Sequence, residues 1–364
     1  MNNYIEPIKI ALIFFPFIAF VISVPFVLVE YHRFGSLSFL KSLIIYSFVF
    51  YIICAYFLII LPLPERSEVL LLKTPRMQLI PFKFIYDFIK ETNFTSFFKI
   101  FINNSFIVPL YNIFLTMPFA IYIRYYFKID LKQTLKYTFL LSLFFELTQL
   151  SGLYFLYPRS YRLFDIDDLF LNTLGGLIGY YIAPLLIKHL PERVKLEKEA
   201  RKKGRKISGF RRLSSLLLDL FLYMIFTSIV SSIFHNVKFT IISIITIFIY
   251  YVVIPFILGG STLAEKYLNL KVVDMKDKNN ILKLFLRRLF FIISYIVVPI
   301  ILLVIAMFIY YNVKENELLK ITIICIYAVI VIVMYSVSII KYVFTDKQML
   351  YEKLSTTKMI STIK

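Results

Sequence analysis

Long apolar runs, separated by short polar segments, make up most of the chain. Because a helix needs about 20 residues to cross a hydrocarbon core ~30 Å thick, runs of this length predict transmembrane helices. The runs are continuously apolar and lack the two-residue alternation of a membrane barrel strand. We place the predicted spans near residues 8–29, 39–61, 106–126, 135–156, 169–190, 213–234, 237–258, 289–311 and 321–343. The pattern therefore predicts an all-α integral membrane protein of about nine transmembrane helices.

Composition agrees with this class of protein. Hydrophobic residues make up 60% of the 364 positions and charged residues 17%, whereas a soluble domain has about 25% charged residues. The two cysteines, Cys54 and Cys325, lie inside apolar runs and show no metal-ligand spacing. The first run lacks the basic leader and small-residue cleavage site of a signal peptide, so we expect it to be retained as a span.

The distribution of basic residues predicts how the chain crosses the membrane. A net charge of +19 would suggest a nucleic-acid partner in a soluble protein, but here topology accounts for it. If segment 191–212 is cytoplasmic, 29 of the 41 Lys and Arg residues lie on the inside, as the positive-inside rule requires. We therefore predict an outside N-terminus, a cytoplasmic C-terminus and no nucleic-acid partner.

Two polar segments divide the chain. Segment 191–212 is the only long charged stretch, and it predicts a basic cytoplasmic linker between two helical bundles. We expect a first membrane domain at 1–190, with one extra N-terminal span, and a second at 205–364. In the long loop 62–104, residues 81–94 carry apolar side chains at helical spacing, which indicates either an interfacial helix or a re-entrant segment.

A polar stripe runs along the span predicted at 135–156. At about 100° per residue, Ser142, Glu146 and Gln149 fall on one helix face. A carboxylate within the membrane costs at least ~2.5 kcal/mol, so this face must lie against protein or water. Glu146 is therefore a candidate functional residue.

The next span carries a second stripe, from which Asp167 points away. The polar and small residues on its one face are Asp165, Asp168, Asn172, Gly175, Gly176 and Gly179. Glycines four residues apart let a neighbouring helix approach closely. Consecutive antiparallel helices pack side by side, so the two stripes should meet if the preceding helix ends near Gly152.

The meeting of the stripes predicts a polar cluster at the outer membrane face that binds a headgroup or sugar. The expected ligand-binding residues are Glu146, Gln149, Arg159, Arg162, Asp165, Asp168 and Asn172. In this interpretation the two arginines offset the carboxylates.

Other roles for these carboxylates remain open. The aspartates suit a helix N-terminus, where they complement the dipole. A metal site built from Glu146, Asp165 and Asp168 is an alternative, although no histidine joins them. Since no nucleophile–base pair with recognisable spacing is present, an enzyme is disfavoured, and we expect neither a cofactor nor a resident metal.

The residues of this region resemble the VanZ-like family. The pattern E-L-x-Q-L, followed by R-x-F-D-I-D-D-x-x-x-N-T-x-G-G-x-x-G, runs from Glu146 to Gly179. Upstream, the L-I-P-F run ending at Phe82 and the run holding Asn112, Pro118 and Phe119 also match, although Ala120 replaces the family's usual Gly. The resemblance covers roughly 60–190 and implies an envelope protein of the bacterial plasma membrane, linked to teicoplanin-type lipoglycopeptide resistance.

The second half resembles the RDD family over about 205–364. The matching motif residues are Arg212, Asp219, Gly259, Gly260, Thr262 and Lys266, with Glu352 at the place of the second Asp. Ala264, Glu265 and Asn269 depart from the family pattern. Asp219 lies inside an apolar span, where an acid needs a partner. The resemblance implies a link to transport, including ion exchange; the alternative is a stabilising or regulatory membrane module.

Three functions fit the sequence. We predict an envelope protein whose outward cluster engages membrane lipids or a lipid-linked ligand and lowers lipoglycopeptide susceptibility. A secondary transporter would use Glu146 and Asp219 as coupling carboxylates and would be favoured by inverted repeats, which the chain does not display. A lipid-modifying enzyme would need a histidine near the outer cluster.

Overall fold

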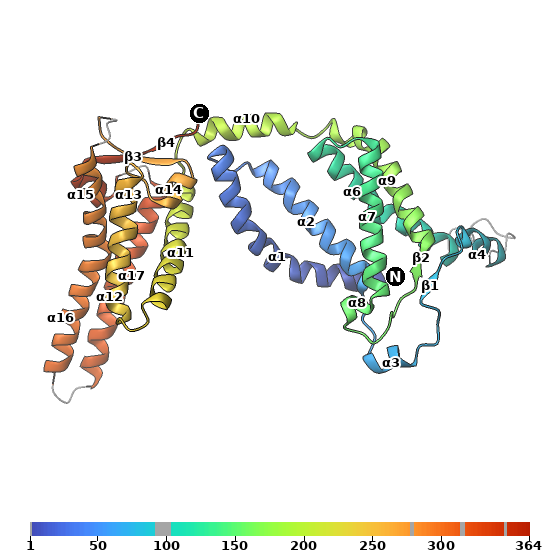
Figure 1. The fold of residues 1–364 in the computed structure, drawn as a ribbon, viewed down its shortest axis with the longest axis horizontal. Helices are drawn as coiled ribbons and strands as arrows, with labels where there is room; N and C mark the ends of the chain where they lie inside the picture. The colour runs from blue at the N-terminus through green and yellow to red at the C-terminus, as the bar shows by residue number, and fades with distance from the viewer. Residues whose placement is uncertain (1, 92–102, 277–279, 314–316, 346–347) are drawn as a thin grey trace. The chain divides into compact units, whose positions relative to one another are not determined.

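The computed structural model describes residues 2–91, 103–276, 280–313, 317–345 and 348–364, the side chains from residue 6 onward. Packing divides the chain into two compact units, whose elements are labelled in Figure 1. The N-terminal unit comprises Met1–Ser23 and Phe39–Leu196, and the C-terminal unit comprises Val24–Ser38 and Glu197–Lys364. The end of the first helix, which the sequence places in the first domain, thus belongs to the C-terminal unit by packing.

The N-terminal unit is a helical bundle with a short parallel ladder. Its elements are α1 (Asn2–Phe34, shared with the other unit), α2 (Phe39–Ile60), α3 (Arg66–Leu71), β1 (Met77–Gln78), α4 (Lys83–Glu91), α6 (Asn104–Phe127), α7 (Leu131–Leu150), α8 (Gly152–Phe155), β2 (Phe164–Asp165) and α9 (Ile166–Ile187). Helix α10 (Arg193–Gly204) continues from this unit into the next.

The C-terminal unit is a second helical bundle with an antiparallel ladder. Its elements are α11 (Gly209–Ile233), α12 (Phe239–Phe248), η1 (Ile249–Val253), α13 (Ile254–Ile257), α14 (Leu263–Tyr267), β3 (Leu270–Asp274), α15 (Ile281–Ile292), η2 (Ile293–Val297), α16 (Val298–Asn312), α17 (Glu317–Phe344), α18 (Leu350–Leu354) and β4 (Thr357–Ser361). The segments η1 and η2 are π-helical turns inside longer helices.

Eight helices of the described residues are long and apolar enough to cross a membrane. This confirms the predicted class, an all-α membrane protein; the sidedness of the termini stays a prediction. The ninth expected span, α7, is a helix of 20 residues but is not among the eight. Its polar stripe lowers its hydropathy, and it packs between α2, α6 and α9.

Local sequence signals set where several of these helices begin. The side chains of Asn103, Asp130, Asp165 and Ser208 accept hydrogen bonds from first-turn backbone amides of α6, α7, α9 and α11. Such N-caps satisfy amides that have no partner within the helix. The caps therefore fix the start of each helix independently of membrane depth.

The predicted helix in the long loop is present as α4, which covers Lys83–Glu91. Ile85, Tyr86 and Ile89 on α4 are exposed, in agreement with either an interfacial or a re-entrant segment. Residues 92–94 of the prediction lie outside the described residues. Strand β1 pairs with β2 in parallel, with Gln78 opposite Asp165, and so places the segment just before α4 beside the start of α9.

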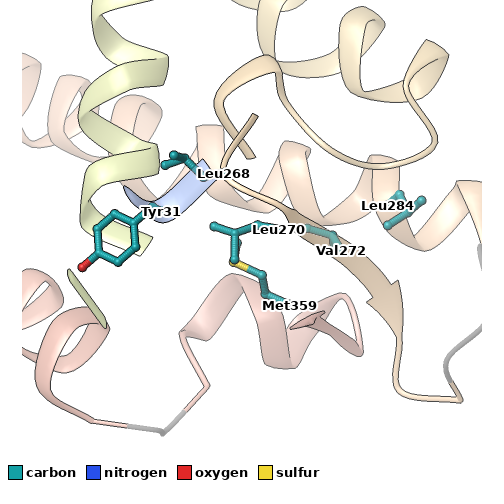
Figure 2. Close-up of a cluster of buried hydrophobic side chains, with 6 residues drawn as sticks. All are labelled: Tyr31, Leu268, Leu270, Val272, Leu284 and Met359. Atoms are coloured by element: carbon teal, nitrogen blue, oxygen red, sulfur yellow. The ribbon is translucent and has the colours of Figure 1, made fainter. Parts of the chain in front are cut away.

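The core of the C-terminal unit lies around the β3–β4 ladder. Figure 2 shows its buried side chains, Tyr31, Leu268, Leu270, Val272, Leu284 and Met359. Leu270 and Val272 lie two residues apart on β3, so they share one face of the strand. Tyr31 comes from the end of α1, which explains why that segment belongs to this unit.

Candidate functional site

The two polar stripes of the sequence face each other across α7 and α9. The side-chain amide nitrogen of Asn172 donates to the Ser142 hydroxyl, 2.8 Å away. The Thr116 hydroxyl on α6 donates to the backbone carbonyl of Asn172 at 2.6 Å. Glu146 on α7 accepts from the backbone amide of Asp165 at 3.0 Å. All of Asn172, Ser142, Thr116 and Glu146 are buried. Three helices thus meet along one polar seam.

A left-handed turn brings Glu146 to the level of the second stripe. Helix α7 ends at Leu150, six residues before the predicted end, and Gly152, Leu153, Tyr154 and Phe155 all have φ between 55° and 67°. Left-handed backbone is strained for residues other than glycine and stops a right-handed helix. Because α7 ends early, Glu146 lies about one turn from its end and reaches the first residue of the α9 N-terminus.

The three aspartates of this N-terminus make different contacts. Asp165 caps α9 by accepting from the Asp167 amide at 2.9 Å, and burial raises the pKa of its carboxyl. Asp168 accepts a hydrogen bond from Asn112 on α6. Asp167, 2% exposed, accepts from the backbone amides of Phe82 and Phe84. Asp167 does point away from the stripe, but it is a buried part of the fold.

The two arginines bind the loops around the cluster. Arg159 donates to the backbone carbonyls of Leu72 and Thr74, and Arg162 donates to that of Leu61. Arg162 also lines the cavity described next, whereas Arg159 does not. Of the two, Arg162 is therefore the one placed to meet a ligand.

A cavity of about 450 Å³ opens between α2, α6, α7 and α9. The polar residues on its wall are Asn112, Glu146, Gln149, Arg162, Asp168 and Asn172. The other lining residues are mostly apolar or aromatic and come mainly from α2 and α6, among them Ala55, Leu58 and Leu115. Five of the seven expected ligand-binding residues line this cavity; Arg159 and Asp165 do not. No three or more His, Cys, Asp or Glu residues of the described segments form a group that could hold a metal ion.

The glycines of α9 let the helices of this unit approach closely. A Cβ at Gly175 would lie 2.2 Å from the Ile113 carbonyl oxygen, and one at Gly179 would lie 2.5 Å from that of Met117. A Cβ at Gly176 would meet the Thr138 side chain on α7 at 2.5 Å. Gly175 and Gly179 therefore allow α6 to pack closely against α9, and Gly176 does the same for α7. This close packing brings the polar side chains of the three helices into contact.

In the C-terminal unit, Asp219 on α11 is held by three donors. Its carboxylate accepts from the hydroxyls of Tyr250 at 2.8 Å and Thr262 at 2.6 Å, and from the Ala264 amide at 3.2 Å. Thr262 is the N-cap of α14. The G-G-S-T segment noted in the sequence therefore places the start of α14 beside Asp219. The π-helical turn η1 carries Tyr250; such turns recur at functional sites.

Two buried ion pairs accompany Asp219, and sequence reasoning missed both cations. Arg287 pairs with Glu352 at 2.9 Å, and Arg288 pairs with Glu265. Burial would raise the pKa of Glu265, but the Arg288 guanidinium outweighs it and holds the pKa below its ordinary value. An Arg pair inside an apolar run was the available signal, but it had been counted only toward topology. Glu265, a departure from the family pattern, supplies one partner.

Of the two adjacent arginines at the start of α11, Arg211 is fully buried, whereas the motif residue Arg212 is only partly buried. Arg211 donates to four backbone carbonyls, those of Gly35, Gly204, Leu268 and Asn269. It therefore ties the end of α1 and the end of α10 to the β3 segment. Arg212 is half-buried and lies with its guanidinium 5.8 Å from the centre of the Tyr342 ring.

The remaining motif residues are structural or exposed. Gly259 and Gly260 have φ of +73° and +108°, which favour glycine, so they form the turn that leads to Thr262. Lys266 is exposed and does not join the buried ion pairs.

Fold and site together define a polytopic helical membrane protein of two units, the first with a polar-lined cavity and the second with a buried Asp219 and two buried ion pairs. Residues 48–187 match the VanZ/LLP1 family and residues 208–319 match the RDD family. The chain therefore joins a VanZ-like domain to an RDD domain, as the sequence motifs indicated. Comparison with curated proteins and with solved structures gave no match. Glu352 lies beyond the matched RDD range, yet it packs in the same unit.

Proposed function

We propose that the VanZ-like unit binds the polar headgroup of a membrane lipid or lipid-linked envelope molecule, and thereby lowers susceptibility to teicoplanin-type lipoglycopeptides at the bacterial plasma membrane. The observation that carries this proposal is the mixed lining of the 450 Å³ cavity. Carboxylate and amide groups line it together with apolar side chains, which suits an amphiphile.

The polar wall favours a headgroup with N–H or O–H donors. Asn172 is 3% exposed, and its side-chain oxygen has no hydrogen-bond partner in the structure. A buried acceptor without a partner costs free energy, which a donor from the ligand would remove. Glu146 and Asp168 add acceptor oxygens on the same wall. Sugar hydroxyls and ammonium groups are donors of this kind.

The test compares resistance conferred by two variants on the same helix. Glu146→Gln keeps the side-chain shape and still accepts from the Asp165 amide, but it removes the carboxyl group from the cavity. We expect it to abolish protection against teicoplanin at unchanged membrane abundance. Asp130→Asn makes the same acid-to-amide change at the exposed N-cap at the opposite end of α7, where Asn caps equally well, and should keep protection. Equal minimum inhibitory concentrations for the two variants would refute the proposal.

The transporter alternative makes a different prediction for Asp219. Glu146 and Asp219 line separate cavities in separate units. If both were coupling carboxylates of one transporter, Asp219→Asn would abolish protection as fully as Glu146→Gln. Under our proposal Asp219→Asn leaves teicoplanin protection intact, provided that the variant reaches the membrane in normal amount.

A further inference from the structure

The RDD unit holds a second cavity of about 310 Å³, built without any residue of the VanZ-like unit. Helices α11, α12, α15 and α17 contribute to its wall. The tyrosines that line it are Tyr223, Tyr251, Tyr295, Tyr335, Tyr342 and Tyr351. Half of the remaining lining residues are leucine, isoleucine or phenylalanine. The wall therefore suits a mainly apolar occupant.

Proline shapes one side of this wall. Pro299 has no amide hydrogen to donate to the Tyr295 carbonyl, and the Tyr335 hydroxyl donates to that oxygen at 2.5 Å. The π-helical turn η2 carries Tyr295. The hydroxyl of Tyr335, a residue that lines the cavity, is thus satisfied within the protein.

The charged groups at the cavity are already paired. Asp219 accepts three hydrogen bonds, and Glu265 is paired with Arg288. An entering cation would therefore have to displace a protein donor from a carboxylate. The paired set contains three acids and two arginines when Glu352 is included, so it does not attract an anion. An uncharged occupant neither displaces a donor from a carboxylate nor places a charge beside the buried acids.

Two buried donors at the cavity remain without a partner. The Ser215 hydroxyl and the Nε of Arg287 make no hydrogen bond in the structure, although these residues are 2% and 1% exposed. Both residues line the cavity. An unpaired buried donor needs an acceptor, and an uncharged carbonyl supplies one. We propose that this cavity binds an apolar membrane molecule through an uncharged carbonyl group, such as an ester.

The test uses tyrosine fluorescence of the full chain in nanodiscs, since the sequence contains no tryptophan. Three quenchers with the same brominated chain are compared: 9,10-dibromostearic acid methyl ester, the free acid and 9,10-dibromooctadecane. We expect saturable quenching by the ester, with an affinity about tenfold above that of the alkane because of the additional hydrogen bonds. The free acid, measured as its carboxylate, should bind more weakly than the ester.

Matched serine variants on α11 locate the binding site. Ser215→Leu fills the cavity and should remove the saturable quenching, whereas Ser214→Leu, one residue away and outside the cavity lining, should keep it. Ser215→Ala should lower the ester affinity several-fold and leave the alkane affinity unchanged. It also keeps the test valid if Ser215→Leu does not fold.

Three results would overturn the proposal. These are equal affinities for ester and alkane, tighter binding of the acid than of the ester, and ester binding that Ser215→Ala does not weaken. Absence of saturable quenching by every probe would overturn it as well. Because the teicoplanin assay depends on the other unit, failure of either proposal leaves the other standing.

Discussion

The Asp167 carboxylate, at the second residue of α9, accepts a hydrogen bond from the Phe82 backbone amide at 2.6 Å. Its second oxygen accepts from the Phe84 amide at 3.0 Å. Phe82 has a left-handed backbone (φ 62°) and its ring stacks on Phe170 of α9. The L-I-P-F run that resembles the VanZ-like family is therefore anchored to the start of α9 by an acid outside the polar stripe.

Asp167→Asn should destabilise the protein, because an amide offers only one acceptor oxygen to two buried amides. Hydrogen bonds to a charged group contribute about 1.5–3 kcal/mol. We therefore expect the free energy of unfolding, measured by thermal unfolding, to fall by about that amount. Asp87→Asn, which breaks a partly exposed i,i+4 pair with Lys83, should change the unfolding temperature little. Equal effects of the two substitutions would show that the Asp167 contacts add nothing to stability.

Gly175→Ala should separate α6 from α9. Its Cβ would lie 2.2 Å from a backbone oxygen, which cannot rotate away, and overpacking of this kind costs about 1–3 kcal/mol or more. An alanine at the preceding position, Leu174→Ala, shortens an exposed side chain and serves as the control. The measurements are thermal unfolding and teicoplanin protection, and both should fall only for the glycine variant.

Arg211→Lys should harm the C-terminal unit far more than Arg212→Lys. A lysine has three donors on one nitrogen and cannot reach the four carbonyls that the planar guanidinium serves. The unpaired carbonyls should cost a few kcal/mol. The readout is the amount of folded, monodisperse protein after extraction. If Arg212→Lys proves the more harmful, then Arg212 holds the structural role that the family motif implies.

The Glu265–Arg288 pair should make stability depend on pH at the acidic end. The pKa of Glu265 lies below its ordinary 4.5 in the folded state, so the pair stabilises the protein above that value and the stabilisation is lost as pH falls through the folded pKa. Glu265→Gln should therefore lower the unfolding temperature at pH 7, with a difference from the parent protein that shrinks toward pH 3. A difference that is constant with pH would exclude this ionic contribution.

Cysteine labelling tests the predicted sidedness. With Cys54 and Cys325 replaced by alanine, a cysteine at the exposed Thr74 should react with an impermeant maleimide in intact cells. A cysteine at Lys202, exposed on α10, should react only after lysis. Gly204 is unsuitable because a Cβ there would lie 2.0 Å from the Phe34 carbonyl oxygen. The reverse labelling pattern would place the polar cavity of the VanZ-like unit on the cytoplasmic side.

The sequence by itself determined the membrane class, the approximate places of eight of the nine predicted spans and the two polar stripes. These features follow from local rules, since span length, helical periodicity and the cost of a charge in lipid act on each segment separately. The same rules placed Glu146 and Asn172 on faces that must meet protein, and the family motifs in the two halves were visible as residue patterns.

Only the tertiary structure decided which charged groups line a cavity and which hold the fold together. Glu146 reaches the α9 N-terminus because a left-handed turn ends α7 early, and Arg287 pairs with Glu352, 65 residues away. Arg211 is buried and Arg212 is not, because the ends of α1 and α10 supply carbonyls to one of two adjacent residues. Such choices depend on distances between segments remote in sequence, which periodicity and composition do not contain.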